Sequence, residues 1–537
     1  MKKIMLLFWK QNLVLFFIML GLAISTSLIS FSTAEVVNSI VTFTPSIFWK
    51  SVLKMVIFYV FFLLFTYLKM RKVSSTIQSM STHIRGETTK SLINSGFQNF
   101  KMRTTGTYAS WLSNDISQIE QLGFKIFYEL ISGIVTAVIA LFSLVFFHWT
   151  LALLTFVEVL LLLQIPKIYK KQIEKKTSEI TNQNELFLEK VTDFFNGFSA
   201  IYTLKKQDFI LNKIIAASLK LGDAKNDHQK TMAGVAITGG IGNVFGQVSI
   251  FILTGVLILL KQISIGSIAA TGSLTANIFN TMGNVSQYIS SINGVAPIFE
   301  KLNSIPIESY EPVSIQNNSP LGFSLKDVSY KYGGKPVLNK INYNFEFNKK
   351  YAIIGESGSG KSTLLNIMSG KIKDYQGSVM LNNQEISTIS YADLFEQMIV
   401  IDQKIHLFNT TIRENLVLDD DFSDETIWQA LNEVGLKEFV EKLPNQLDSF
   451  VGENGNLISG GQAQRIAFAR GILRNKNIML IDEGTSNLDK ENSLLIEKNL
   501  LAKKNLTLIM ITHRLSSTVE AQLDGVLDLN HFSSVNV

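Results

Sequence analysis

The sequence at residues 355–363 is Gly-Glu-Ser-Gly-Ser-Gly-Lys-Ser-Thr. An apolar strand pattern at residues 351–354 precedes it, and a helical pattern at residues 362–368 follows it. This order is the context that a phosphate-binding loop requires, because glycine-rich backbone N–H groups and a helix N-terminus then surround phosphate oxygens. We therefore predict an α/β nucleotide-binding domain, in which Lys361 reaches the β- and γ-phosphates and Ser362 is placed for Mg²⁺.

A second phosphate-contacting signature, Ile-Ser-Gly-Gly-Gln, lies at residues 458–462. An isolated P-loop enzyme does not need it. Two further apolar runs end in polar residues, one in Asp482 and Glu483 and the other in Thr512 and His513. An acid at the carboxyl end of a buried strand can hold Mg²⁺, and the next acid can polarise the attacking water. This order indicates nucleotide hydrolysis, with His513 placed to bond the γ-phosphate.

The first half of the chain has a different character. The mean hydropathy is +0.23, and only 17% of residues are charged. Residues 1–300 carry 26 Lys and Arg against 15 Asp and Glu, whereas the rest carries 23 against 29. Because the basic half is also the apolar half, these cations suit the ends of membrane helices better than a nucleic-acid surface, so no nucleic-acid partner is expected. The chain has no cysteine, which excludes disulfides, thiol catalysis and Cys-ligated metal.

A membrane-spanning helix needs about 20 apolar residues, and we predict six such helices. They lie at residues 12–34, 47–68, two within 130–166 separated near His148, 231–260 and 262–299. Lys and Arg gather before the first helix and in two long loops, which places these loops and both termini in the cytoplasm. The alternative, core helices of a soluble protein, is disfavoured by this alternation of loop charge.

The two long loops, at residues 70–125 and 167–230, have helical composition. We therefore expect the neighbouring membrane helices to extend well beyond the bilayer. Two aromatic stretches, at residues 106–115 and 194–202, are predicted contact points with the nucleotide domain. The alternative for both is an ordinary end of a helical hairpin.

Several polar side chains fall at membrane depth, where such groups are unfavourable in lipid and should face a protein interior or a watery cavity. These candidate substrate-cavity residues are Glu158, Asn243, Gln247, Asn277, Asn280 and Asn284. For the amides, the alternative is hydrogen bonding between helices without contact to cargo. For the acid, the alternative is a neutral structural group.

Composition also sets the expected domain boundaries. Residues 301–320 hold three prolines and a polar run, which is typical of a linker. We expect a transmembrane domain at residues 1–300, a linker at 301–320 and a nucleotide-binding domain at 321–537.

Together these residues resemble half-transporters of the ATP-binding cassette (ABC) family, of the exporter type, over nearly the whole chain. The resemblance implies a six-helix membrane domain with long cytoplasmic extensions, fused to an α/β P-loop ATPase domain. It implies Glu483 as catalytic base, His513 as switch and Gln403 as a contact to water, with Mg²⁺ held through Ser362, Gln403 and Asp482. The nucleotide contacts that it implies are Tyr332, Gly355, Ser357, Gly358, Ser359, Gly360, Lys361, Ser362, Thr363, Ser459, Gly460, Gly461, Gln462 and Asp489.

The resemblance also implies a partner. In this family the signature serine and glycines contact ATP bound to a second subunit, so a dimer is expected, and the sequence leaves homodimer and heterodimer open. The implied function is ATP-driven export, or leaflet translocation, of a peptide, lipid or amphipathic small molecule by alternating access. The implied location is the plasma membrane of a bacterial cell, as a multi-pass protein. The alternatives are an importer and a nucleotide-gated channel or sensor of the same architecture.

Three features depart from the family pattern. The signature begins with Ile458, where Leu is usual, and Phe450 stands where exporters commonly carry an acid. The helices that usually end the domain are not expected after Leu527, which puts dimer contacts through them in doubt. Phe450 is expected to alter the contact with the membrane-domain loops.

Overall fold

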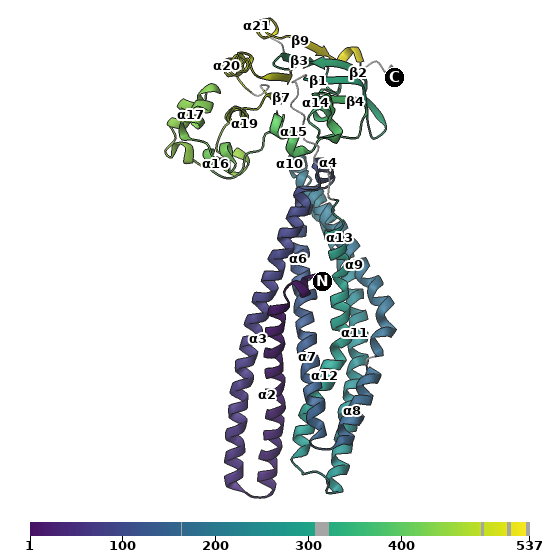
Figure 1. Ribbon diagram of the computed structural model, residues 1–537. Coiled ribbons are helices and arrows are strands. Elements are labelled where there is room, and N and C mark those ends of the chain that lie inside the picture. Colours follow the sequence, from purple (N-terminus) through teal and green to yellow (C-terminus); the bar gives the residue numbers. More distant parts are fainter. Residues whose placement is uncertain (163, 307–321, 485–487, 513–516, 533–537) are drawn as a thin grey trace. The chain divides into compact units, whose positions relative to one another are not determined.

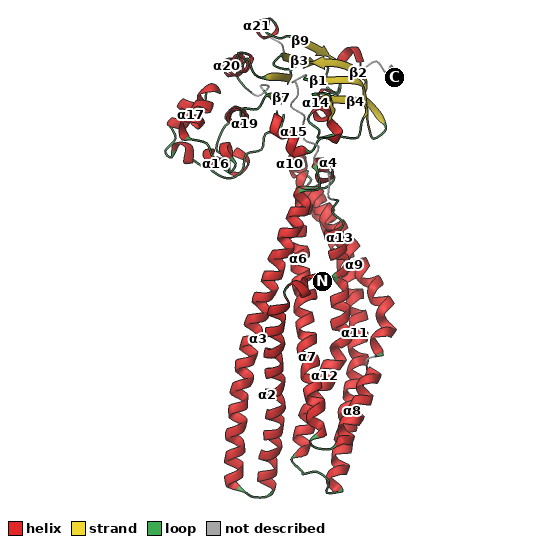
Figure 2. Ribbon diagram, viewed as in Figure 1, coloured by secondary structure: helices red, strands yellow, loops and turns green. Residues whose placement is uncertain are grey.

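The computed structural model describes residues 1–162, 164–306, 322–484, 488–512 and 517–532. The chain divides into two compact units, Met1–Ile307 and Glu308–Val537. Unit 1 is helical, and unit 2 contains all the strands of the described residues (Figures 1 and 2). The change of unit falls within the predicted linker, most of which lies outside the described residues.

Unit 1 is a bundle of long helices that lie side by side (Figure 1). Its long helices are α2 (Trp9–Val41), α3 (Pro45–Ile93), α7 (Ile126–Val145), α8 (Trp149–Leu162), α9 (Ile165–Asn196), α11 (Gln207–Leu259) and α12 (Ser267–Gly294). Its short helices are α1 (Lys2–Leu7), α4 (Phe97–Lys101), α5 (Thr105–Ser110), α6 (Ile116–Gln118), α10 (Phe198–Thr203) and α13 (Ala296–Asn303), and two π-helical turns are η1 (Trp111–Asp115) and η2 (Ile119–Lys125).

Each of the six predicted membrane segments lies in a helical region. Among the described residues, four helices are long and apolar enough to cross a membrane: Trp9–Val41, Pro45–Ile93, Thr105–Val145 and Gln207–Leu259. The apolar helix Trp149–Leu162 is shorter. The sixth segment forms α12, which is not among the four because Ser, Thr, Asn and Gly interrupt its apolar residues. A total of six spans therefore stays a prediction.

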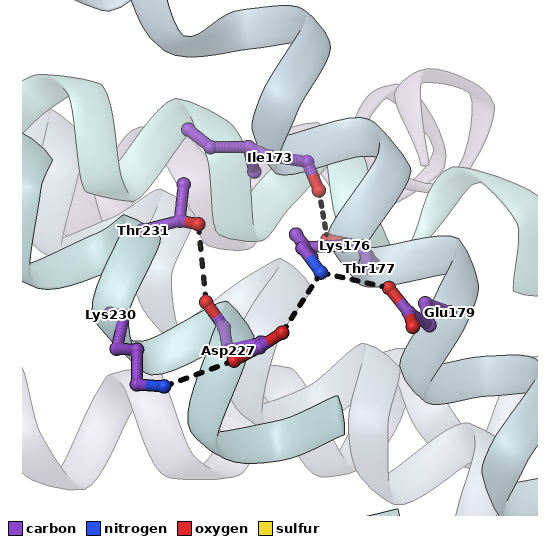
Figure 3. A network of polar contacts seen from close by, with 7 residues as sticks. All are labelled: Ile173, Lys176, Thr177, Glu179, Asp227, Lys230 and Thr231. Carbon is purple, nitrogen blue, oxygen red and sulfur yellow. Dashed lines mark hydrogen bonds and ion pairs between the residues drawn. The ribbon is translucent and has the colours of Figure 1, made fainter. Parts of the chain in front are cut away.

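The helices extend far beyond their apolar segments, as predicted. α3 has 49 residues and α11 has 53, which corresponds to about 74 and 80 Å against a hydrocarbon core of about 30 Å. Outside the apolar part, α9 and α11 are joined by polar contacts (Figure 3). Lys176 Nζ lies 3.1 Å from both Glu179 Oε2 and Asp227 Oδ2, and Lys230 Nζ lies 3.2 Å from Asp227 Oδ1. Of these three pairs, Lys176–Asp227 joins the two helices, and the other two lie within α9 and within α11.

The two predicted contact stretches differ in exposure. In residues 106–115, Tyr108 and Trp111 are buried inside unit 1, because Tyr108 stacks on Phe100 and Trp111 lies beneath the cation of Lys301. The two large aromatic side chains of that stretch therefore lie inside unit 1, whereas its small residues Gly106 and Ala109 are exposed. In residues 194–202, by contrast, aromatic side chains on and near α10 are exposed. Contact of either stretch with unit 2 stays a prediction.

Unit 2 contains two sheets. The first is antiparallel with strand order β2-β1-β4-β5, and the second is parallel with strand order β6-β7-β8-β3-β9. The antiparallel strands are β1 (Phe323–Tyr332), β2 (Lys335–Phe345), β4 (Gln376–Leu381) and β5 (Gln384–Glu385). The parallel strands are β3 (Lys350–Ile354), β6 (Met398–Ile401), β7 (Ile478–Asp482), β8 (Thr507–Ile511) and β9 (Gly525–Asp528).

The helices of unit 2 pack on these sheets and form a lobe beside them (Figure 1). They are α14 (Lys361–Met368), α15 (Tyr391–Gln397), α16 (Ile412–Val417), α17 (Asp424–Glu433), α18 (Lys437–Glu441), α19 (Gly460–Leu473), α20 (Lys490–Leu501) and α21 (Ser517–Glu520). Short 3₁₀ turns are η3 (Ile386–Thr388), η4 (Gln446–Asp448), η5 (Glu453–Gly455) and η6 (Leu529–Phe532). β7 and β8 are buried along their whole length, so the parallel sheet is a rigid platform whose strands end at one edge.

Candidate functional site

The P-loop joins β3 to α14, as the sequence predicts. Gly360 precedes the helix with φ of 92°, in the left-handed region, and a Cβ there would lie 2.9 Å from the carbonyl oxygen of Val337. Only glycine fits such a position without strain. Lys361 is buried, and its ammonium group donates to the carbonyl oxygens of Gly355 and Glu356, at 2.8 Å each. Two carbonyl oxygens of the loop thus hold the lysine that is predicted to bind phosphate.

Two polar groups of the loop fit a phosphate ligand. The hydroxyl of Ser359 is buried and has no hydrogen-bond partner among the described residues, so it is free to bond a phosphate oxygen. The backbone N–H of Glu356 donates to Asn530 Oδ1 at 2.8 Å. Asn530 lies in η6, directly after β9, and sequence reasoning did not identify it. Asn530 thus bonds the first residues of the P-loop although it lies 174 positions later in the sequence.

The predicted metal ligands Ser362 and Asp482 lie together at the carboxyl edge of the parallel sheet. Ser362 Oγ donates to Asp482 Oδ1 at 3.0 Å. Burial raises the pKa of the Asp482 carboxyl, and the Ser362 hydrogen bond lowers it. A nearby cation would therefore be stabilising there. The described residues hold no group of three or more His, Cys, Asp or Glu that could hold a metal ion.

Glu483, the predicted base, has an unusual backbone. Its φ is 51°, a left-handed conformation that is uncommon for a residue other than glycine. The side chain accepts a hydrogen bond from Gln403 Nε2 at 2.7 Å. The structure thus brings together two predicted site residues that are 80 positions apart, and the amide of Gln403 orients the carboxylate.

The structure gives less information on two other predicted site residues. His513 lies outside the described residues, so its position relative to Glu483 is not described. Tyr332 ends β1 and is 75% exposed. An exposed ring at a strand end is available for stacking on a base, and its role stays a prediction.

The predicted signature forms the first turn of α19. Ser459 is the N-cap and forms a capping box with Gln462: Gln462 N–H donates to Ser459 Oγ at 3.3 Å, and Ser459 N–H donates to Gln462 Oε1 at 2.7 Å. Gly460 is exposed, and a Cβ on it would meet nothing within 4 Å. The free N–H groups of Gly460 and Gly461 therefore form an open helix N-terminus, which favours an anion.

Asp489 is connected to this signature helix. It is the N-cap of α20 and accepts bonds from Asn492 N at 2.9 Å and Asn492 Nδ2 at 2.7 Å. These backbone and side-chain bonds lower the pKa of Asp489. Arg465 of α19 in turn donates to Asn492 Oδ1 at 3.0 Å and to the Gly435 carbonyl at 2.7 Å. Asp489 and the signature helix are thus linked through Asn492 and Arg465.

Asn415 is a buried hub that sequence reasoning did not single out. It is 0% exposed. Its Nδ2 donates to the Phe408 carbonyl at 2.9 Å and to Thr410 Oγ1 at 3.1 Å. Its Oδ1 accepts from Phe408 N at 2.9 Å and Arg470 Nη2 at 3.3 Å. Asn415 thus ties the segment after Gln403 to α16 and α19.

We predict that Asn415→Ala destabilises the chain by about 2–4 kcal/mol, because several buried groups lose their partner at once. Thermal unfolding of the full chain in detergent measures this. The matched control is Asn344→Ala, which removes one exposed hydrogen bond to Ser324 and is expected to change stability by less than about 1 kcal/mol. Equal losses of stability in the two variants would contradict the central role of Asn415 in this hydrogen-bond network.

In unit 1, three of the predicted cavity amides form one chain of hydrogen bonds. Gln247 Nε2 donates to Asn243 Oδ1 at 2.7 Å, and Asn243 Nδ2 donates to Asn280 Oδ1 at 2.8 Å, across α11 and α12. Asn284 Nδ2 donates to the Asn280 carbonyl at 2.9 Å, and Asn277 lies one turn before Asn280. We call Asn243, Gln247, Asn280 and Asn284 the amide ladder. Both predicted roles, helix contact and cavity lining, fit this arrangement.

Glu158 lies apart from the amide ladder. It is 7% exposed and contacts Ser249 of α11, whose hydroxyl donates to Glu158 Oε1. Ser249 and Gln247 are two residues apart on a helix, so they point about 200° away from each other. The sequence prediction grouped Glu158 with the amides because all lie at membrane depth. In the structure, Glu158 contacts one side of α11 through Ser249, and the amide ladder lies on another side of that helix.

The comparisons with known proteins support both units. Residues 11–282 match the sequence model of the ABC transporter transmembrane region, and residues 338–486 match that of the ABC transporter domain. The chain belongs to the ABC transporter family. The family match covers both halves of the chain, which confirms the resemblance and the fold class predicted from the motifs.

Individual relatives specify the type of ABC transporter. The chain is 26% identical to the multidrug resistance-like ATP-binding protein MdlB of Buchnera aphidicola, over 97% of this chain and 91% of that protein. It is 29% identical to the ATP-dependent lipid A-core flippase of Haemophilus influenzae, over 73% and 68%. Its fold matches a bacterial Atm1-family ABC exporter with ATP bound, with a TM-score of 0.83, 20% identity and coverage of 97% and 94%. The chain is an exporter-type ABC transporter, a membrane protein with an ATPase that is coupled to transport.

Proposed function

We propose that two copies of this chain, or one copy and a related subunit, export an amphipathic small molecule, a lipid or a peptide from the cytoplasm, or translocate it between leaflets, by ATP-driven alternating access. The observation that supports this is the set of nucleotide-site elements among the described residues of unit 2. A P-loop that holds Lys361, an acid pair at Asp482 and Glu483, and an open signature helix at Gly460 occur on one chain.

We assign the following roles to the residues of this site. Lys361, Ser359 and the N-terminus of α14 bind the phosphates of ATP. Glu483, oriented by Gln403, takes the proton of the attacking water. Gly460 and Gly461 of the partner copy bind the γ-phosphate from the other side, and Asp489 lies at the seam between copies. Ser362, Gln403 and Asp482 would hold Mg²⁺, which would supply positive charge beside the phosphates.

The proposal also covers topology. Both termini and unit 2 lie in the cytoplasm, since Lys and Arg gather at that end of the membrane segments, and the membrane is a bacterial plasma membrane. The amide ladder lines the path of the cargo. Its amides are neutral, so they suit a cargo with hydrogen-bonding groups on an apolar body.

The direct test is ATP-driven accumulation in vesicles with unit 2 facing outward. The probes are an amphipathic dye, a headgroup-labelled phospholipid and a labelled apolar peptide. We expect at least one to accumulate inside, or to change leaflet, only with ATP and Mg²⁺, and not with Glu483→Gln. ATP-dependent flux that only dissipates a gradient would instead indicate a channel, and ATP-driven efflux from these vesicles would indicate an importer.

A further inference from the structure

Glu158 has one oxygen with no partner. Ser249 Oγ donates to Oε1, whereas Oε2 is buried and makes no hydrogen bond among the described residues. α8 has no other acid, and Glu158 lies nine residues from Trp149, which is about 14 Å along the helix. A carboxyl group at that depth, with half of its hydrogen-bonding capacity unused, is not explained by the amide ladder or by the ATPase site.

Among the described side chains, no cation forms an ion pair with this carboxyl group. α7, α11 and α12 pack against α8, and residues 231–259 of α11 and all of α12 contain no Asp, Glu, Lys, Arg or His. The other titratable groups of the helices around α8 lie toward their ends. Glu129 pairs with Lys69 in the first turn of α7, Tyr288 lies nine residues beyond the Phe279 that packs on Gly246, and His148 precedes α8.

An ionised carboxylate without a cation in a hydrocarbon environment is strongly unfavourable, so the group takes up a proton instead. The protonated form still has a buried O–H without an acceptor. Ser249, in contrast, has a second acceptor, because its hydroxyl lies 2.9 Å from the Gly246 carbonyl in its own helix. The Ser249 hydroxyl therefore keeps an acceptor when it no longer bonds Glu158. It has an acceptor both when α8 and α11 are in contact and when they separate.

We propose that Glu158 is a proton-binding site of the transport cycle. Its carboxyl group holds a proton on Oε2 while α8 and α11 pack as in this structure. When closure on ATP moves these helices apart and water reaches the site, the O–H bond breaks, the proton passes to water and the carboxylate remains. Return of the helices requires that a proton from water binds Oε2 again. The inference rests on the proposed transport cycle.

The experiment is infrared difference spectroscopy of the full chain in lipid, which separates the carbonyl stretch of a protonated carboxylic acid from that of a carboxylate. Glu483→Gln serves as the parent because it is expected to hold the ATP-closed state. We expect a protonated-carboxyl band without nucleotide, loss of that band on addition of ATP and Mg²⁺, and its absence from Glu483→Gln/Glu158→Gln in both states.

Two further variants keep the result interpretable if Glu158→Gln does not fold. Ser249→Ala removes the donor to Oε1 and should shift the band, whereas Thr155→Val, one turn away on α8, should not, since Thr155 bonds only the Leu151 carbonyl of its own helix. No Glu158-dependent band without nucleotide, or a band that ATP leaves unchanged, would overturn the proposal. Absence of ATP turnover in the unsubstituted chain would refute the cycle itself, and the band without nucleotide would still show whether Glu158 holds a proton.

Discussion

Glu483→Gln is expected to bind ATP, to lose turnover by at least about 100-fold, and to accumulate a closed dimer. The glutamine has nearly the same shape, and its carbonyl oxygen can still accept the Gln403 hydrogen bond. It cannot take the proton of the attacking water, and loss of a general base typically lowers the rate by about 10²–10⁴-fold. ATPase assays and nucleotide-binding measurements on reconstituted protein separate the two effects.

The matched control is Glu441→Gln, an exposed acid on α18 that pairs weakly with Lys437 at 3.9 Å. It should hydrolyse ATP like the unsubstituted chain. Full ATPase activity in Glu483→Gln would refute the assignment of the base, whatever the control shows.

Lys361→Met is expected to weaken ATP binding by at least about tenfold and to lower ATPase activity by about 100-fold or more. A charge-assisted hydrogen bond to phosphate contributes about 1.5–3 kcal/mol, and each 1.4 kcal/mol is about a factor of ten in affinity. Removal of one preorganised donor from a charged transition state lowers the rate by about 10²–10³-fold. Titration with a fluorescent ATP analogue and a turnover assay measure the two quantities.

Unit 2 offers an unusually close control for this substitution. Lys350, at the start of β3, the strand before the P-loop, is also 5% exposed, and its ammonium group donates to the carbonyl oxygens of Lys503 and Leu506. Lys350→Met should lower the unfolding temperature, while the folded fraction binds ATP normally. Equal loss of ATP affinity in both variants would mean that the effect of Lys361→Met is structural.

The parts of the nucleotide site that consist of residues close together in the sequence were predictable. The glycines and Lys361 lie in one loop between a buried strand and a helix, and the capping box that orders Ser459 and Gln462 spans only four residues. The spacing of residues in the sequence is enough to predict contacts of this short range. The same holds for the long apolar helices of unit 1, whose composition alone distinguishes them.

The contacts that orient the site were not predictable, because they join distant positions. Asn530 reaches the P-loop across 174 residues, Gln403 reaches Glu483 across 80, and Ser249 reaches Glu158 across 91. The burial of Trp111 in the stretch at 106–115 was not predictable for the same reason. Whether Trp111 is exposed depends on how the cation of Lys301, far along the chain, packs over its ring.

The central claim is that ATP closes one chain's P-loop onto another chain's signature. The chain has no cysteine, so introduced cysteines are the only ones present. Glu356 in the P-loop and Leu457 before the signature are exposed, and neither side chain is a proposed nucleotide contact. In the Glu483→Gln background, chains with Glu356→Cys are mixed with differently tagged chains with Leu457→Cys, and disulfide formation is followed with and without ATP and Mg²⁺.

The account predicts a disulfide-linked dimer that carries both tags and forms rapidly only with ATP. A dimer that forms at the same rate without ATP, or no dimer at all, would contradict it.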